Sequence, residues 1–220
     1  MLWLKTVMLN KFNLKIIILL AALAASVAGL LIGKQLQSPA EKKSFAISNF
    51  HGTYLHSPRQ ISAFELQGID LQKFNNHSFI GQWTILFFGF TNCSYVCPTI
   101  MAELAKMYRI LQISNVKLLP RVVMISLDPK RDSLAKLTNY VKTFNPDFYG
   151  ARGESHLLKK ITKEMGVAYA KIVMANNKKN YDIQHTGALM LVNPHGQLQA
   201  FFTPPHQANL LAQDYQLLVS

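Results

Sequence analysis

The chain is poor in cysteine. Of its 220 residues only Cys93 and Cys97 are cysteines, and both lie in the stretch FGFTNCSYVCPT, residues 88–99. A disulfide between them would close so short a loop that it would constrain the unfolded chain, and therefore stabilise the fold, very little. A purely structural role for the pair is the weakest interpretation, and the two thiols require a chemical explanation.

Acidic residues are also scarce. Eleven Asp and Glu stand against 23 Lys and Arg, which leaves a net charge of +12, and none precedes Glu41. This surplus is typical either of a solvated positive surface or of contact with anionic lipid or an acidic partner. There is no long basic run, which argues against nucleic acid as a partner. The sequence has no internal repeat and no low-complexity tract. Its length suits one domain plus an appendage.

The appendage contains the one long apolar run, IIILLAALAASVAGLLIG at 16–33, which has no charged or amide side chain. Its length is at the lower limit for crossing a bilayer, and we interpret it as a retained transmembrane anchor. A cleaved signal peptide is the alternative, since AALAAS contains small-residue sites, although a signal core is usually shorter. Both interpretations export the rest of the chain.

The first segment, residues 1–15, is short and carries three lysines. A short basic N-terminus favours the inner side of the membrane and places the following domain outside. No transit peptide rich in Arg and Ser is present, which favours a bacterial inner membrane, with the domain facing the periplasm, over a mitochondrial inner membrane. Residues 34–44 are polar and contain a proline, so they predict a linker before a domain at 45–220.

The periodicity of apolar residues predicts the elements of this domain. In chain order we expect a hairpin within 48–70, a strand at 83–90, a helix over 97–111, a strand at 121–128, helices at 134–144 and 156–165, strands at 167–174 and within 187–203 around a turn at 193–196, and a helix at 208–219. Strands joined by a crossover helix run parallel, and the late hairpin makes the sheet mixed. This order predicts an α/β thioredoxin-like fold with an N-terminal β-hairpin extension.

Pro98 places the two thiols relative to the first helix. Proline is tolerated in the first turn of a helix, so the helix is expected to begin near Cys97 and to leave Cys93 on the preceding loop. The partial positive charge of a helix N-terminus favours thiolates. Two chemical roles remain open: a thiol–disulfide enzyme with a C-x-x-x-C pair, or a metal site in which two thiolates and one imidazole hold Cu(I).

One histidine is well placed to be the third ligand. The chain has seven, His51, His56, His77, His156, His185, His195 and His206. His185 directly precedes a predicted buried strand that runs antiparallel to the cysteine-bearing strand in a thioredoxin-like layout. Cys93 and Asp128 both follow carboxyl ends of predicted parallel strands, where α/β sheets place their sites. We therefore expect His185, Asp128 and the thiols to meet at one sheet edge.

Three segments, in the same order, resemble the Sco/SenC copper-chaperone family. FFGFTNCSYVCPTIMAEL is similar to the family pattern F-G-F/Y-T-x-C-P-x-x-C-P. SLDPKRDSLAKLTNYVKTF resembles S-x-D-P-x-R-D-T-x-x-x-L-x-x-Y, and HTGALMLVNPHGQLQAFF resembles H-S-x-x-x-Y-L-x-x-P-x-G-x-F. The resemblance covers roughly Phe45 to the C-terminus. Ser94 stands where the family commonly has Pro, and Gln184 where an Asp often precedes the His, so another group must orient the imidazole.

The resemblance implies that Cys93, Cys97 and His185 bind copper, as Cu(I), Cu(II) or both, and that the protein delivers it to the binuclear copper site of cytochrome c oxidase during assembly. The oxidase subunit that carries this site and other copper carriers are the implied partners. Asp128 is implied beside the site without being a ligand; a role in starting the next helix is its alternative.

The family also suggests an enzymatic alternative, a thiol–disulfide reductase that keeps the oxidase cysteines reduced. Cys93 would then attack and Cys97 resolve, so that the two form a redox-active disulfide. Thioredoxin-like oxidoreductases place a cis-proline before the strand that faces the cysteines. This chain has no proline in the corresponding segment, residues 184–186. That difference favours the metal site.

Overall fold

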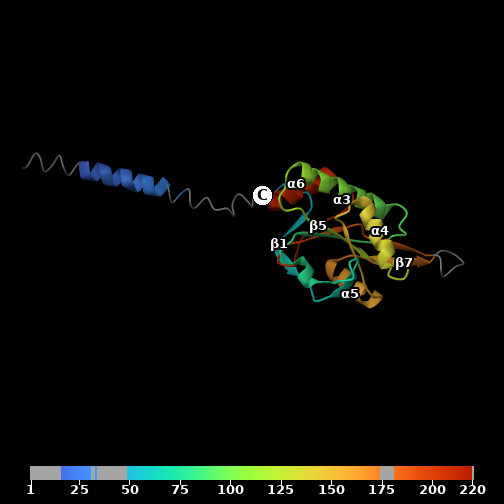
Figure 1. Ribbon diagram of the computed structural model, residues 1–220. Coiled ribbons are helices and arrows are strands. Elements are labelled where there is room, and N and C mark those ends of the chain that lie inside the picture. The colour runs from blue at the N-terminus through green and yellow to red at the C-terminus, as the bar shows by residue number, and fades with distance from the viewer. Residues whose placement is uncertain (1–15, 31–32, 34–48, 174–180, 220) are drawn as a thin grey trace, which may run out of the picture. The chain divides into compact units, whose positions relative to one another are not determined.

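The computed structural model describes residues 16–30, 33, 49–173 and 181–219, shown as coloured ribbon in Figure 1. The chain divides into two units, Met1–Ser48 and Asn49–Ser220. In the first unit, residues 16–30 are helical and exposed. Within the described residues, no helix combines the length and apolar character that a bilayer span requires. The predicted N-terminus 1–15 and linker 34–44, with residues 31 and 32 of the predicted anchor, lie outside the described residues.

The second unit is built on an eight-stranded mixed sheet with the order β1-β10-β9-β4-β5-β6-β2-β3. The strands are β1 (Thr53–Gln60), β2 (Glu65–Gly68), β3 (Lys73–Asn75), β4 (Thr84–Gly89), β5 (Arg121–Ser126), β6 (Tyr149–Arg152), β9 (Leu189–Val192) and β10 (Gln197–Phe202). β4, β5 and β6 are parallel, and β9 runs antiparallel to β4. The predicted mixed sheet of a thioredoxin-like fold is confirmed.

Helices cover both faces of this sheet. They are α3 (Val96–Ile113), α4 (Leu134–Phe144), α5 (Ser155–Met165) and α6 (Ala208–Val219), with a short 3-10 helix η1 at Asn76–Phe79. The crossovers β4-α3-β5 and β5-α4-β6 advance in the same direction across the sheet, and right-handed crossovers therefore place α3 and α4 on the same face. Figure 1 shows α3, α4 and α6 on one side of the sheet and α5 on the other.

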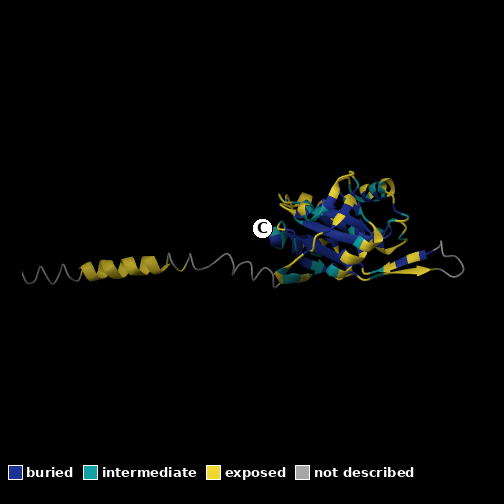
Figure 2. Cartoon of the chain, turned by 90° about the horizontal axis from the view of Figure 1, so that it is seen from below, coloured by how far each residue is buried: buried dark blue, intermediate teal, exposed yellow. Residues whose placement is uncertain are grey.

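The core follows the predicted apolar pattern. Every residue of β4 is buried, as expected for a strand covered on both faces. The helix predicted over 97–111 buries the apolar stripe of α3, which comprises Ile100, Leu104, Met107, Tyr108 and Leu111. Figure 2 shows the buried residues gathered in the strands and on the inner sides of the helices, with exposed residues outside. The helix predicted at 156–165 ends at Gly166, whose φ of 71° is readily adopted by glycine.

The predicted hairpin within 48–70 is wrong. β1 pairs with β10 at one edge of the sheet, whereas β2 pairs with β3 and β6 near the other edge. A hairpin needs a short turn at the surface, but the connection after β1 has its apolar residues Ile61 and Phe64 in the core. Asn76 fixes this connection, because its side chain donates to the Ile61 carbonyl at 2.8 Å and accepts from the Phe64 N–H at 3.1 Å.

A second, two-stranded sheet lies beside the main one. It consists of β7 (Tyr169–Val173) and β8 (Tyr181–His185), paired antiparallel so that Tyr169 lies opposite His185. β7 corresponds to the strand predicted at 167–174, of which residue 174 lies outside the described residues. β8 and β6 were not predicted. β8 delivers His185 to the edge where β4 ends.

Candidate metal centre

The two thiols occupy the predicted positions around the start of α3. β4 ends at Gly89, and α3 begins at Val96, so Pro98 falls in its first turn. Cys93 is partly buried on the loop, while Cys97 is fully buried in the helix. The Cys97 N–H donates to Cys93 Sγ at 3.2 Å, and both thiols are free. The first turn of α3 therefore supplies one of its unpaired N–H groups to a sulfur atom.

His185 reaches the same point from the opposite side. β9 begins at Leu189, opposite Phe87 near the end of β4, which confirms the predicted sheet edge. The Thr186 carbonyl lies 3.0 Å from His185 Nδ1, so Nδ1 is assigned the proton and Nε2 faces Cys97 Sγ at 3.3 Å. This carbonyl takes the orienting role that Gln184 does not fill.

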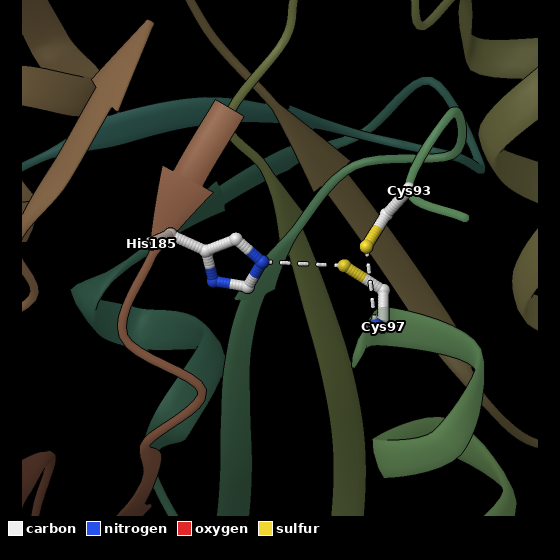
Figure 3. Close-up of side chains that lie close together, drawn as sticks. All are labelled: Cys93, Cys97 and His185. Carbon is white, nitrogen blue, oxygen red and sulfur yellow. Dashed lines mark hydrogen bonds between the residues drawn. The ribbon is translucent and has the colours of Figure 1, made fainter. Parts of the chain in front are cut away.

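The three side chains form one cluster. Figure 3 shows both sulfur atoms and the His185 Nε2 atom turned toward a common point between α3, its preceding loop and β8. The ligand atoms of Cys93, Cys97 and His185 all lie within 4.8 Å of one another. Metal–sulfur and metal–nitrogen bonds in proteins are about 2.0–2.3 Å long, so small side-chain rotations bring all three onto one ion.

The surroundings of the cluster are apolar. The rings of Phe87 and Phe90 lie 6.0 and 5.9 Å from the His185 ring, measured between centroids. A Cβ added at Gly89 would lie 3.1 Å from Cys97 Sγ and 2.7 Å from the Phe87 ring, so glycine leaves room for the thiol. Phe87 and Phe90 are themselves buried, so the side of the cluster that faces the core is apolar.

The two thiols differ in acidity. The hydrogen bond from the Cys97 side chain, assisted by the N–H groups of Cys97 and Tyr95, lowers the pKa of Cys93 to about 4 against the opposing effect of burial. The same Cys93 sulfur, together with burial, raises the pKa of Cys97. At neutral pH the pair therefore holds one thiolate, on Cys93, and one shared proton.

The low pKa of Cys93 predicts that its alkylation rate is independent of pH around neutrality. In the metal-free reduced protein, the iodoacetamide reaction at Cys93 should stay constant from weakly alkaline to weakly acidic pH, because the thiolate persists until the pH approaches the pKa of about 4. Mass spectrometry of the modified peptide measures this rate. The urea-unfolded protein is the control, since its thiols titrate near the ordinary pKa of roughly 8.5. A folded-state rate that falls about tenfold per pH unit below neutrality would contradict the assignment.

Asp128 follows the end of β5, and among the described residues its carboxylate makes no hydrogen bond to the three side chains of the cluster. Its buried carboxylate accepts from Tyr181 Oη at 2.7 Å and from Arg131 Nε. The Arg131 guanidinium lies over the Tyr181 ring at 3.8 Å and near the Phe90 ring at 5.9 Å. Asp128 is thus connected to the cluster through these neighbours, since Tyr181 begins β8 and Phe90 packs on His185.

The alternative role of Asp128 at a helix start is wrong. α4 is capped by Ser133, whose side chain accepts from the Lys136 N–H at 3.2 Å. The Asp128 carboxylate is engaged by Tyr181 and Arg131 instead. The cap falls on Ser133 because the chain first makes a separate turn after Asp128.

Asp132 is a structural residue of the site that sequence reasoning missed. Its buried carboxylate accepts from the Thr91 N–H at 3.0 Å, from Thr91 Oγ1 at 2.5 Å and from Ser126 Oγ at 2.6 Å. It thereby joins the cysteine loop to the end of β5. The second aspartate of the D-P-x-R-D segment was the available signal, but the sequence gives no sign of its contact with Thr91.

The remaining histidines lie elsewhere, as far as the structure describes them. His51 contacts the buried Asp214 carboxylate with Nδ1 at 2.8 Å and also with its backbone N–H. His156 and His195 are exposed. His185 is therefore the histidine that the fold brings to the thiols.

Fold and cluster together define a thioredoxin-like α/β domain with two thiols and one imidazole at the edge where β4 ends. A family model described as SCO1/SenC matches residues 53–220, and the chain belongs to this family. An SCO2-like protein of Rickettsia prowazekii is 30% identical over 190 residues, which cover 86% of this chain and 90% of that protein.

Solved structures show the same fold. The crystal structure of Arabidopsis thaliana ScoI with copper bound is 28% identical with a TM-score of 0.65, covering 71% of this chain and 95% of that one. The solution structure of apo Sco1 from Thermus thermophilus is 29% identical with a TM-score of 0.68, covering 77% and 96%. The resemblance drawn from the three sequence segments is confirmed at the level of the family.

Proposed function

We propose that this protein is a membrane-anchored copper metallochaperone that delivers copper to the binuclear copper site of cytochrome c oxidase during its assembly. Cys93, Cys97 and His185 are the proposed copper ligands. The apolar segment 16–33 is the proposed anchor, residues 34–44 the linker, and 45–220 the copper-carrying domain on the periplasmic side of a bacterial inner membrane. The partners are the oxidase subunit that receives the copper and other copper carriers.

The observation that carries this proposal is the cluster of two sulfur atoms and one imidazole nitrogen within 4.8 Å. Thiolate and imidazole ligands suit copper, and two thiolates favour Cu(I) over harder ions. The copper-bound structure of the related Arabidopsis ScoI supports the choice of copper. The apolar segment 16–33, which has no charged side chain, supports the proposed anchor.

The positions of the ligands suit a carrier that must also release its cargo. Cys93 is partly exposed on a loop, whereas Cys97 is fully buried at the helix start. An acceptor thiolate therefore reaches the copper from the Cys93 side and replaces Cys93 first. Exchange with a disulfide of a partner would take two electrons from the pair, release the one proton that the two sulfur atoms share, and join them in a disulfide that leaves the ion without its sulfur ligands.

A thiol–disulfide reductase is the second candidate, because the low pKa of Cys93, about 4, makes it a thiolate at neutral pH. Its thiolate would attack a disulfide of the acceptor and expel one acceptor thiolate. Cys97 would then lose its proton and attack the Cys93 sulfur. The products would be a Cys93–Cys97 disulfide and a reduced acceptor.

Two assays on the reduced protein test the proposal against this alternative. In the first, Cu(I) is titrated in the presence of a competing chromophoric chelator; one copper per chain is expected, with affinity weakened by His185→Ala. In the second, oxidised and reduced forms of a separate copper-site domain of the oxidase are offered to the protein. Transfer of copper to the reduced domain would support the chaperone function. Reduction of the oxidised domain by a protein that binds no copper would contradict the proposal and favour the reductase function.

A further inference from the structure

The loop that follows His185 is held by a histidine far along the chain. His206 Nε2 lies 2.6 Å from the Gly187 carbonyl oxygen, and His206 is partly buried. A carbonyl accepts hydrogen bonds and does not donate them, so Nε2 is the donor. Burial lowers the pKa of His206, which favours the neutral ring with its proton on Nε2.

This bond acts on the orientation of the His185 ring. His185 Nδ1 faces the Thr186 carbonyl at 3.0 Å, and the Gly187 carbonyl is the next one along the chain. The Thr186 N–H is held by the Ala168 carbonyl at 3.0 Å. The peptide that orients the imidazole is thus flanked by two held peptides, one bonded to Ala168 just before β7 and the other bonded to His206.

His206 is in turn tied to the helix that carries Cys97. Glu103, which lies on α3, accepts the Ala208 N–H at the start of α6 at 2.9 Å. Gly187 also packs against α3, because a Cβ added there would lie 2.9 Å from Ile100 and 3.6 Å from Val96. α3 thus carries Cys97 and also, through Glu103, holds Ala208, two residues after His206, whose ring reaches back to Gly187 beside His185.

We propose that His206 is a positioning residue of the copper centre, which holds the loop after His185 so that Nε2 faces the two sulfur atoms. This inference rests on the proposed copper site. Hydrogen bonds that orient a metal-ligating histidine commonly contribute 10- to 100-fold in affinity. Because His206 acts through one intervening peptide, its loss is expected to weaken copper binding by about tenfold, at the lower end of that range.

The test compares variants of the full chain, purified in detergent, by Cu(I) competition and by nitrogen hyperfine coupling in the electron paramagnetic resonance spectrum of the Cu(II) form. His206→Leu removes the donor and should bind Cu(I) about tenfold more weakly, with altered nitrogen coupling. His195→Leu is the matched control, since His195 is exposed in a turn, and should bind as the unaltered protein does. Equal affinity and equal coupling in His206→Leu and His195→Leu would overturn the inference.

A second pair of variants separates positioning from folding. Glutamine presents an N–H at the same number of bonds from Cα as His Nε2, whereas asparagine carries the same amide on a side chain one carbon shorter. His206→Gln should therefore retain affinity and nitrogen coupling, and His206→Asn should lose about tenfold. Equal Cu(I) affinities in these two variants would contradict the inference. This comparison holds even if His206→Leu does not fold.

His185→Ala distinguishes failure of this inference from failure of the proposed site. If His185→Ala loses the nitrogen coupling but the His206 variants do not differ, only the positioning role is wrong. If His185→Ala leaves affinity and coupling unchanged, His185 is not a ligand, and the inference about His206 is overturned with it.

Discussion

Replacement of Cys97 by serine is expected to remove nearly all copper binding. A hydroxyl is not ionised at neutral pH and is a poor ligand for a soft ion, so the site keeps one sulfur and one nitrogen. Four-ligand structural zinc sites bind with about 10–16 kcal/mol, which corresponds to roughly 2.5–4 kcal/mol per ligand. Loss of one ligand should therefore weaken Cu(I) binding by roughly 100- to 1,000-fold, as measured by chelator competition.

Ser94→Ala is the matched control for this loss. Ser94 is exposed on the same loop, between the two cysteines. Its replacement leaves all three ligands in place, so affinity should stay within about threefold of the unaltered protein, which is less than 1 kcal/mol. A Cys97→Ser protein that retains the affinity of Ser94→Ala would exclude Cys97 as a ligand.

Replacement of Arg131 by methionine is expected to destabilise the fold strongly. It removes the partner of the Asp128 carboxylate, whose side chain is only 4% exposed, and it also removes the donor of the 2.8 Å bond from Nη1 to the Tyr181 carbonyl. Loss of one partner of a buried ion pair typically costs 3–5 kcal/mol, because the remaining charge is uncompensated. Urea denaturation should show a loss of about 3 kcal/mol, the lower value reflecting the partial exposure of Arg131.

Two further variants test whether the loss of stability comes from the buried ion pair. Asp128→Asn combined with Arg131→Met removes both charges, and the double variant should be less destabilised than the sum of the single variants. Lys73→Met serves as control, because Lys73 and Glu65 form an ion pair whose side chains are 73% and 56% exposed. Exposed pairs contribute at most about 1 kcal/mol. A similar loss of unfolding free energy in Arg131→Met and Lys73→Met would contradict the stabilising role of the buried Asp128–Arg131 pair.

The site was largely predictable because its placement depends on local rules. Pro98 marked the helix start after the cysteine-bearing strand. The antiparallel strand that follows His185 begins where that strand ends, which placed His185 beside Cys93 and Cys97. The pairing of β1 with β10 was not predictable in this way. It joins segments more than a hundred residues apart, and the apolar residues Ile61 and Phe64 gave no sign of which edge they approach.

Side-chain contacts across the fold were also beyond the sequence pattern. β8 alternates buried and exposed residues, but its five residues are too few for the period of two to stand out in the sequence. The bonds of Asp132 to Thr91 and of His206 to Gly187 join residues that are distant in sequence. Only the folded arrangement brings these bonds close to the cluster of Cys93, Cys97 and His185.

X-ray absorption of the copper-loaded, reduced protein tests the central claim most directly, because it reports the atoms bound to the metal. The cluster of Cys93, Cys97 and His185 predicts two sulfur atoms and one nitrogen atom around a single Cu(I). His185→Ala should remove the nitrogen contribution and leave both sulfur atoms. A spectrum with sulfur ligands alone in the unaltered protein, or one that His185→Ala does not change, would contradict the three-ligand copper centre.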